Sequence, residues 1–157
     1  MQIEIVPASA FRLTEIEYEQ SWGYGIWPIV VNDVYKANFS RKERIQIWYG
    51  GSGGGKSDAK ATELLHKCIF QDYCRVMFCR KTSESVRLSQ FQLFKDLIKR
   101  YGFSSLFKIG EQAMQITCLK NGNMLFGKGL DDVDKIKSIP DITDIWIEEP
   151  IDREGHI

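Results

Sequence analysis

A glycine-rich stretch followed by lysine and serine carries the most definite chemistry in this sequence. Residues 50–57 read Gly-Gly-Ser-Gly-Gly-Gly-Lys-Ser and fit the spacing G-x-x-x-x-G-K-[ST]. Glycines allow positive φ and a close approach of the backbone to a ligand, so successive N–H groups can surround a phosphate. We expect Lys56 to reach the terminal phosphates of a nucleotide and the Ser57 hydroxyl to bind Mg²⁺. The predicted nucleotide-binding residues are Gly50, Gly51, Ser52, Gly53, Gly54, Gly55, Lys56 and Ser57.

A run of glycine and serine is also the composition of a flexible linker, and the flanking residues decide between the two interpretations. Residues 45–49 are mostly β-branched or aromatic and predict a short strand that ends at Gly50. After Ser57, apolar residues recur at helical spacing and predict an amphipathic helix to about Asp72. Strand, glycine loop and helix are the context that a phosphate-binding loop requires, so this interpretation is favoured.

Two adjacent carboxylates, Glu148 and Glu149, follow the apolar run Asp144-Ile-Trp-Ile and precede Pro150, which would end the strand. In phosphate-transferring enzymes one such group holds Mg²⁺ and another orients the attacking water. We assign Glu148 to the metal and Glu149 to the water, so the predicted catalytic residues are Lys56 and Glu149. Alone, this strand end would usually be a solvated surface feature; the phosphate loop upstream favours the functional interpretation.

Further elements are needed to position these groups. The run at 75–79 predicts a second strand, and Thr82 or Ser83 can cap a helix that stops at Gly102. Two apolar runs flank Asn121-Gly122, which predicts a β-hairpin, and residues 131–137 predict a short helix.

Strands that alternate with helices, apart from one hairpin, predict an α/β protein. The expected fold is a P-loop NTPase-type, mostly parallel sheet flanked by helices on both faces. Ligands bind at the carboxyl ends of strands in such sheets, where residues 50–57 and the pair Glu148–Glu149 would converge.

The composition limits the classes of function. The chain has 157 residues and a formal net charge of zero, so its net charge creates no electrostatic attraction for nucleic acid. Its four cysteines show no CxxC spacing and predict free thiols in a reducing compartment rather than a metal site. Neither a signal peptide nor an apolar run of membrane-spanning length is visible, which predicts a cytoplasmic chain without a membrane partner.

Two regions are predicted along the chain. Residues 1–43 form an irregular, aromatic-rich lead-in segment, and residues 44–157 form the ATPase domain. Within the lead-in, three residues are weak candidates for contact with a nucleotide base: Tyr35, Phe39 and Arg41.

Five motifs, in order and spacing, resemble the large subunit of tailed-bacteriophage terminase, the DNA-packaging ATPase. The resemblance covers roughly residues 44–150. The motifs are Tyr49 to Ser57, Arg80-Lys-Thr82 with Ser85-Val-Arg87, Gly129-Leu-Asp-Asp132, Lys137-Ser138 and Ile145-Trp-Ile-Glu-Glu149.

The resemblance implies a Mg²⁺-dependent ATPase whose subunits form a homo-oligomeric ring at a portal and push DNA into a procapsid in the host cell cytoplasm. Its implied partners are double-stranded DNA bound without sequence preference, the portal protein and the small terminase subunit. Three cations fall in the motif blocks and could offset charge at the γ-phosphate: Arg80, Arg87 and Lys137. They are equally explained as solvated charges at the ends of elements.

The sequence departs from the family pattern in two ways. Many members carry an arginine in the loop where this chain has Ser52, so charge stabilisation is expected from elsewhere, such as a neighbouring subunit. The family also continues into a coupling motif and a nuclease domain, whereas this sequence stops soon after Pro150. We therefore expect an ATPase part that is incomplete at its C-terminus and assign no nuclease activity. The alternative is a truncated module that binds ATP without efficient turnover. A third interpretation, a small-molecule kinase, would require an arginine-rich lid, and the sequence shows no such segment.

Overall fold

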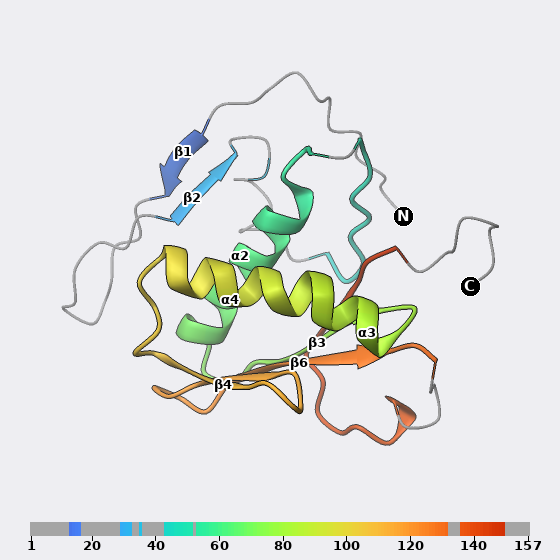
Figure 1. Ribbon diagram of the computed structural model, residues 1–157. Coiled ribbons are helices and arrows are strands. Elements are labelled where there is room, and N and C mark those ends of the chain that lie inside the picture. Colours follow the sequence, from blue (N-terminus) through green and yellow to red (C-terminus); the bar gives the residue numbers. More distant parts are fainter. Residues whose placement is uncertain are drawn as a thin grey trace. The chain divides into compact units, whose positions relative to one another are not determined.

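The structure is a computed structural model, and it describes residues 13–16, 29–32, 35, 43–51, 53–131 and 136–149 (Figure 1). Contacts divide the chain into two compact units, residues 1–63 and 64–157. The boundary falls inside helix α2 (Lys56–Phe70), whose first turns belong to one unit and the remainder to the other. Four residues named in the sequence predictions lie outside the described residues: Phe39, Arg41, Ser52 and Pro150.

The first unit differs from the prediction at two places. The lead-in was expected to be irregular, but it contains strands β1 (Leu13–Ile16) and β2 (Ile29–Asn32), which pair antiparallel. Residues 45–49 were expected to form a strand, but they belong to none. Ile45 and Ile47 are 67% and 51% exposed, so their apolar alternation is not buried against a partner. Strand propensity depends on such a partner, which explains why this prediction is wrong.

The second unit is built on a five-stranded sheet with the order β4-β5-β6-β3-β7. The interior strand β3 (Arg75–Arg80) pairs parallel with β6 (Met124–Gly129) and with β7 (Asp144–Ile147). The other two strands, β4 (Phe107–Gly110) and β5 (Gln115–Cys118), complete the sheet through antiparallel pairings of β5 with β4 and with β6.

The sheet is therefore mixed rather than mostly parallel as predicted. The predicted hairpin at Asn121-Gly122 is confirmed, and Gly122 adopts a φ of +79° in its turn. The prediction failed because β4, a strand of four residues with one charged member, was not recognised. Its pairing with β5 adds a second antiparallel ladder.

One long helical segment follows β3, as the sequence predicted. Thr82 caps it by accepting the Ser85 N–H at 3.2 Å. The segment comprises α3 (Ser83–Val86), the π-helical turn η2 (Arg87–Phe91) and α4 (Gln92–Arg100). Gly102, at φ +71°, ends it, and the Phe103 N–H donates to the Ile98 carbonyl at 2.8 Å. The π-turn was not predicted.

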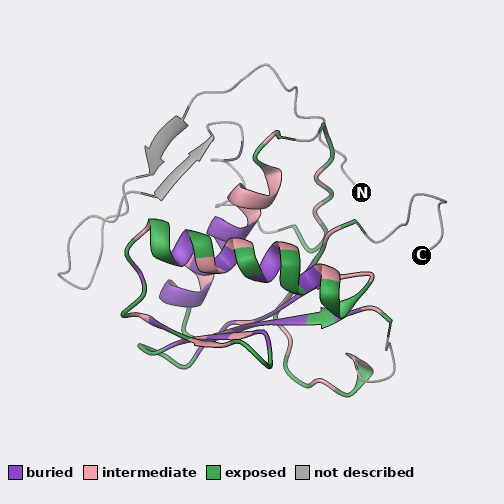
Figure 2. Cartoon of the chain, viewed as in Figure 1, coloured by how far each residue is buried: buried purple, intermediate pink, exposed green. Residues whose placement is uncertain are grey.

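The helical segment packs on one face of the sheet. Phe78 of β3 lies 5.0 Å from Phe94 of α4 between ring centroids, and Phe94 meets Trp146 of β7 edge-on at 5.8 Å. Buried and exposed stretches alternate along α4 in Figure 2, as expected of a helix with one face toward a core. On this face β6 also lies close to α3, at Gly127 and Gly129.

The opposite face carries no long helix among the described residues. Met77, Cys79 and Phe126 form a buried cluster there, with which apolar side chains of the connection before β7 pack: Ile136, Ile139 and Ile142. Helices flank the sheet as predicted, and on this face the described helical residues are 136 and 137, of which Ile136 packs against the cluster. Of the helix predicted at 131–137, residues 136 and 137 are helical, and residues 132–135 lie outside the described residues.

The hairpin tip fixes the end of α2. The Asn123 amide nitrogen donates to the Gln71 carbonyl at 2.7 Å, and its oxygen accepts the Cys74 N–H at 2.8 Å. Asn121 donates to the Cys68 carbonyl at 3.1 Å. These bonds satisfy carbonyls that the helix end would otherwise leave unpaired, and they join α2 to the start of β3.

Two further predictions concern the environment of the chain. In the part of the chain that the structure describes, no helix is long and apolar enough to cross a membrane. All four cysteines are buried free thiols, and burial raises the pKa of Cys79 to about 11.

We expect Gly127→Ala to destabilise the second unit. A methyl group there would lie 2.8 Å from both Phe78 Cε2 and Val86 Cγ1, and such overpacking typically costs about 1–3 kcal/mol. Gly110→Ala is the matched control, because its nearest neighbour, the Gln115 carbonyl oxygen, is 3.6 Å away. Urea unfolding of both variants measures the difference; equal free energies of unfolding would contradict this packing.

Candidate functional site

The glycine loop adopts backbone conformations that only glycine takes without strain. Gly50, Gly53 and Gly55 have φ values of +145°, +78° and +72°. A side chain in the left-handed region costs about 1–2 kcal/mol, so the sequence uses glycine where the backbone requires it. Helix α2 begins at Lys56, directly after the loop, so its N-terminal N–H groups and positive dipole end lie at the loop.

Lys56 closes the loop. Its ammonium donates to the carbonyl oxygens of Gly50 at 2.9 Å and Gly51 at 2.7 Å. The lysine thus holds the start of the loop against the start of the helix. Of the described loop residues, Gly50 and Gly51 contact the ammonium directly, and the role of the loop in phosphate binding stays a prediction.

Two aromatic residues support the loop. The Tyr35 hydroxyl donates to the Gly54 carbonyl at 2.8 Å, and its ring stacks on Trp48 at a centroid distance of 5.2 Å and an interplanar angle of 3°. Burial raises the pKa of the Tyr35 phenol, which keeps it protonated as a donor. From the sequence, Tyr35 is only a weak candidate for contact with a nucleotide base, and Trp48 is expected in a strand. No local pattern reveals a contact between residues 35 and 54.

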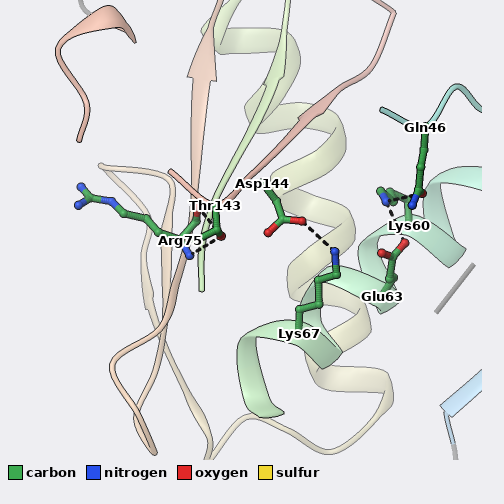
Figure 3. A network of polar contacts seen from close by, with 7 residues as sticks. All are labelled: Gln46, Lys60, Glu63, Lys67, Arg75, Thr143 and Asp144. Atoms are coloured by element: carbon green, nitrogen blue, oxygen red, sulfur yellow. Dashed lines mark hydrogen bonds and ion pairs between the residues drawn. The ribbon is translucent and has the colours of Figure 1, made fainter. Parts of the chain in front are cut away.

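A polar network lies on the first turns of α2 (Figure 3). Lys60 pairs with the buried Glu63 at 2.9 Å, donates to the Gln46 side chain at 3.4 Å, and lies 5.2 Å above the Trp48 ring centroid. A cation over an indole contributes about 0.5–1 kcal/mol at such partly exposed sites. These contacts join the segment before the loop to the helix after it.

Glu148 and Glu149 follow β7, as predicted. The Glu148 N–H still donates to the Cys79 carbonyl at 3.0 Å, so Glu148 continues the ladder with β3. Glu149 leaves it with a φ of +46°, an uncommon conformation for a side-chain-bearing residue that occurs often at functional sites. The two carboxylates therefore have different backbone supports and need not share one role.

Arg80 and Glu149 form an ion pair at the carboxyl ends of β3 and β7. The Arg80 side chain is 17% exposed and that of Glu149 is 73% exposed. Solvent screens a pair with one partner in water, so its main effect is on where the Glu149 carboxylate lies rather than on stability. The structure thus brings together two predicted site residues that are 69 positions apart in the sequence.

The start of β7 is fixed by a second group of contacts in Figure 3. Lys67 of α2 pairs with Asp144 at 2.8 Å. Thr143 accepts the Arg75 N–H at 3.0 Å through its hydroxyl. Both ends of β7 are therefore held by neighbouring elements, which limits how far the carboxylates after it can move.

Comparison with known proteins identifies the family of this chain. The family model described as phage terminase large subunit matches residues 42–154, well over half of the chain. The chain belongs to the phage terminase large subunit family. The matched range contains the glycine loop, the Arg80 region and the two carboxylates.

Two curated terminases are similar in sequence. The PBSX phage terminase large subunit of Bacillus subtilis (strain 168) is 29% identical over 111 residues, which cover 71% of this chain and 25% of that protein. The terminase large subunit of Bacillus phage SPP1 is 29% identical over 103 residues, covering 61% of this chain and 24% of its own length. The chain thus spans about a quarter of the curated relatives that it matches.

The other two cations in terminase motif blocks lie in different surroundings. Arg87 donates to the Glu111 and Gln112 carbonyls at 2.6 and 3.2 Å, at the turn between β4 and β5. Lys137 is exposed and helical, in the connection before β7. Their proposed role in charge stabilisation stays a prediction.

The residues predicted to hold Mg²⁺ in this terminase chain supply the right atoms. A Ser57 hydroxyl and a Glu148 carboxylate are hard oxygen donors of the kind that Mg²⁺ takes alongside phosphate oxygens. The described residues contain no cluster of three or more His, Cys, Asp or Glu side chains able to hold a metal by themselves. The two residues belong to different units, so their joint role stays a prediction.

Proposed function

We propose that this chain binds Mg-ATP and hydrolyses it as the ATPase part of a terminase large subunit that packages viral DNA. The observation that carries the proposal is the loop at 50–57, whose described glycines have the required φ values and whose lysine closes it at the start of α2. Membership of the terminase family supplies the context.

Binding would begin at the loop. Lys56 would exchange the Gly50 and Gly51 carbonyls for the β- and γ-phosphate oxygens, which are stronger acceptors because they are charged. Ser57 and Glu148 would hold Mg²⁺, which neutralises charge on these phosphates when bound. The positive end of α2 favours the same anion.

Hydrolysis would use Glu149 as the group that orients water and accepts its proton. In the structure its carboxylate pairs with Arg80. A carboxylate held by a guanidinium is a weaker base, because the positive charge favours the ionised form. Glu149 would therefore exchange Arg80 for water before turnover, and Arg80 would then lie free to face developing charge on phosphate.

The second hypothesis is a module that binds ATP but turns it over poorly. The chain spans about a quarter of its relatives, so parts of the motor outside it could be needed for turnover. Both hypotheses predict nucleotide binding at the same loop, and they differ only in the rate. The whole motor's partners are proposed from the family: double-stranded DNA, a portal protein, the small terminase subunit and further copies of this chain in a ring.

Lys56→Ala is expected to weaken Mg-ATP binding about tenfold or more, because it removes a charge-assisted contact worth roughly 1.5–3 kcal/mol. Lys108→Ala, which removes an exposed lysine from β4, is the control and should bind as the wild type does. Calorimetric titration measures both. Unchanged affinity and turnover in Lys56→Ala would return residues 50–57 to the linker interpretation.

Glu149→Gln is expected to keep Mg-ATP bound while slowing hydrolysis on the order of 10² to 10⁴-fold, because the amide keeps the shape of the side chain but cannot accept the proton. Glu111→Gln is a matched control, since Glu111 is also a mostly exposed carboxylate in an ion pair, with Lys95. Phosphate release and nucleotide affinity are measured together. Equal loss of binding and rate would exchange the roles of Glu148 and Glu149, and a wild type that binds but does not turn over would favour the second hypothesis.

For DNA, we expect weak binding without sequence preference that falls steeply with salt, because phosphate contacts release counterions. The candidate contacts are Lys95, Lys99, Arg100, Lys120 and Lys128; the alternative is that these residues only keep the surface soluble. Lys95 is paired with Glu111, which competes with DNA phosphates for its ammonium. In a ring, several subunits would add such contacts around one duplex. Titration of duplexes of unrelated sequence at two salt concentrations tests this; tight or sequence-selective binding would contradict a motor and indicate a regulator.

A further inference from the structure

The contact between Tyr35 and the glycine loop has a geometric consequence for the phosphate site. The Tyr35 hydroxyl donates to the Gly54 carbonyl at 2.8 Å. That carbonyl belongs to the same planar trans peptide as the Gly55 N–H, and the two groups of such a peptide point in opposite directions. Fixing the carbonyl toward Tyr35 therefore fixes the Gly55 N–H away from it.

Three groups converge at this peptide. The position where a Gly54 side chain would begin lies 3.4 Å from the Gly51 carbonyl oxygen, 3.7 Å from the Tyr35 hydroxyl and 3.8 Å from the Lys56 ammonium. The Tyr35 hydroxyl and the Lys56 ammonium thus contact the same short piece of loop and hold it through different carbonyls. Glycine flanks the peptide on both sides, so its own torsions leave it free to rotate.

The ring of Tyr35 is itself held in place. It is 7% exposed and stacks on Trp48, which also lies beneath the Lys60 ammonium at 5.2 Å. Lys60 is anchored by its ion pair with Glu63 on the same helix. The hydroxyl is therefore presented by a rigid support rather than by a mobile surface side chain, which is what a positioning contact needs.

We propose that Tyr35 is a positioning residue that locks the peptide between Gly54 and Gly55, so that the Gly55 N–H is directed to a phosphate of the bound nucleotide. The inference rests on the proposed function. It gives Tyr35 a part in recognition of the polyphosphate rather than of the base. Without the hydroxyl, the peptide rotates more freely, and nucleotide binding is weakened by the entropy lost when the peptide becomes ordered.

The test compares Tyr35→Phe, which removes only the hydroxyl, with Tyr35→Ala, which also removes the stack on Trp48. Tyr35→Phe should weaken Mg-ATP and Mg-tripolyphosphate by the same factor, about two- to tenfold, since one neutral hydrogen bond is lost. Tyr73→Phe is the matched control, because that hydroxyl also donates to a backbone carbonyl, of Asp141 at 3.2 Å, outside the loop. Thermal unfolding of all variants separates a binding effect from a loss of folding.

The outcomes distinguish this role from others. If Tyr35→Phe binds both ligands as the wild type does while Tyr35→Ala loses only ATP, Tyr35 is a base platform and the proposal is wrong. If Tyr35→Phe weakens neither ligand and neither does Tyr35→Ala, the contact is purely structural.

A measurement without ligand keeps the test independent of the proposed function. The carbonyl carbon shift of Gly54 and the amide nitrogen shift of Gly55 report the hydrogen bond to that carbonyl, and both should change in Tyr35→Phe but not in Tyr73→Phe. Unchanged shifts would overturn the proposal whether or not the chain binds nucleotide. Changed shifts in a protein that binds neither ATP nor tripolyphosphate would instead contradict the proposed function and, with it, the role in phosphate binding.

Discussion

The second unit depends on β3, which among the described strands is the one with a parallel partner on each side. Its four inner residues, Val76 to Cys79, are at most 2% exposed, so their backbone groups can find partners only in neighbouring strands. β6 and β7 supply them in parallel register. Because Phe78 aligns with Trp146 and Cys79 with Ile147, the residues after both strands come out at the same edge of the sheet. Arg80 and Glu149 meet there for that reason.

Parallel register also explains how distant parts of the chain reach one edge. The connection from β3 to β6 contains the helical segment, β4 and β5, and the connection from β6 to β7 contains the apolar residues that cover the other face. Each connection buries its own apolar side chains against the sheet, which offsets the entropy of closing a long loop. The carboxylates after β7 are thus held by packing far from them in sequence.

In the first unit, side-chain contacts hold a glycine-rich loop in one conformation. Glycine makes the required φ values accessible but leaves the backbone free to adopt others. The contacts of Lys56 and Tyr35 with loop carbonyls restrict that freedom from two sides. A loop that is permissive by composition becomes ordered through side chains that lie outside the glycine run.

The sequence by itself determined the features that depend on neighbouring residues. The spacing of Gly50, Gly55, Lys56 and Ser57, a cap at Thr82 or Ser83, the stop at Gly102 and the turn at Asn121-Gly122 are local patterns. The structure bears out the helix ends and the hairpin, and it selects Thr82 as the cap. Propensity alone misassigned residues 45–49, because a strand needs a partner that sequence does not reveal. It also missed β4, and with it the mixed character of the sheet.

Only the tertiary structure decided which groups meet. It paired Arg80 with Glu149 and placed the Tyr35 hydroxyl on the loop, whereas Arg87 turned to carbonyls between β4 and β5. From charge and spacing alone, Arg80 and Arg87 were equal candidates for charge stabilisation at the phosphate, since both lie in motif blocks near helix or strand ends. The difference arises from strand register and helix packing, which depend on burial summed over many residues and not on any short pattern.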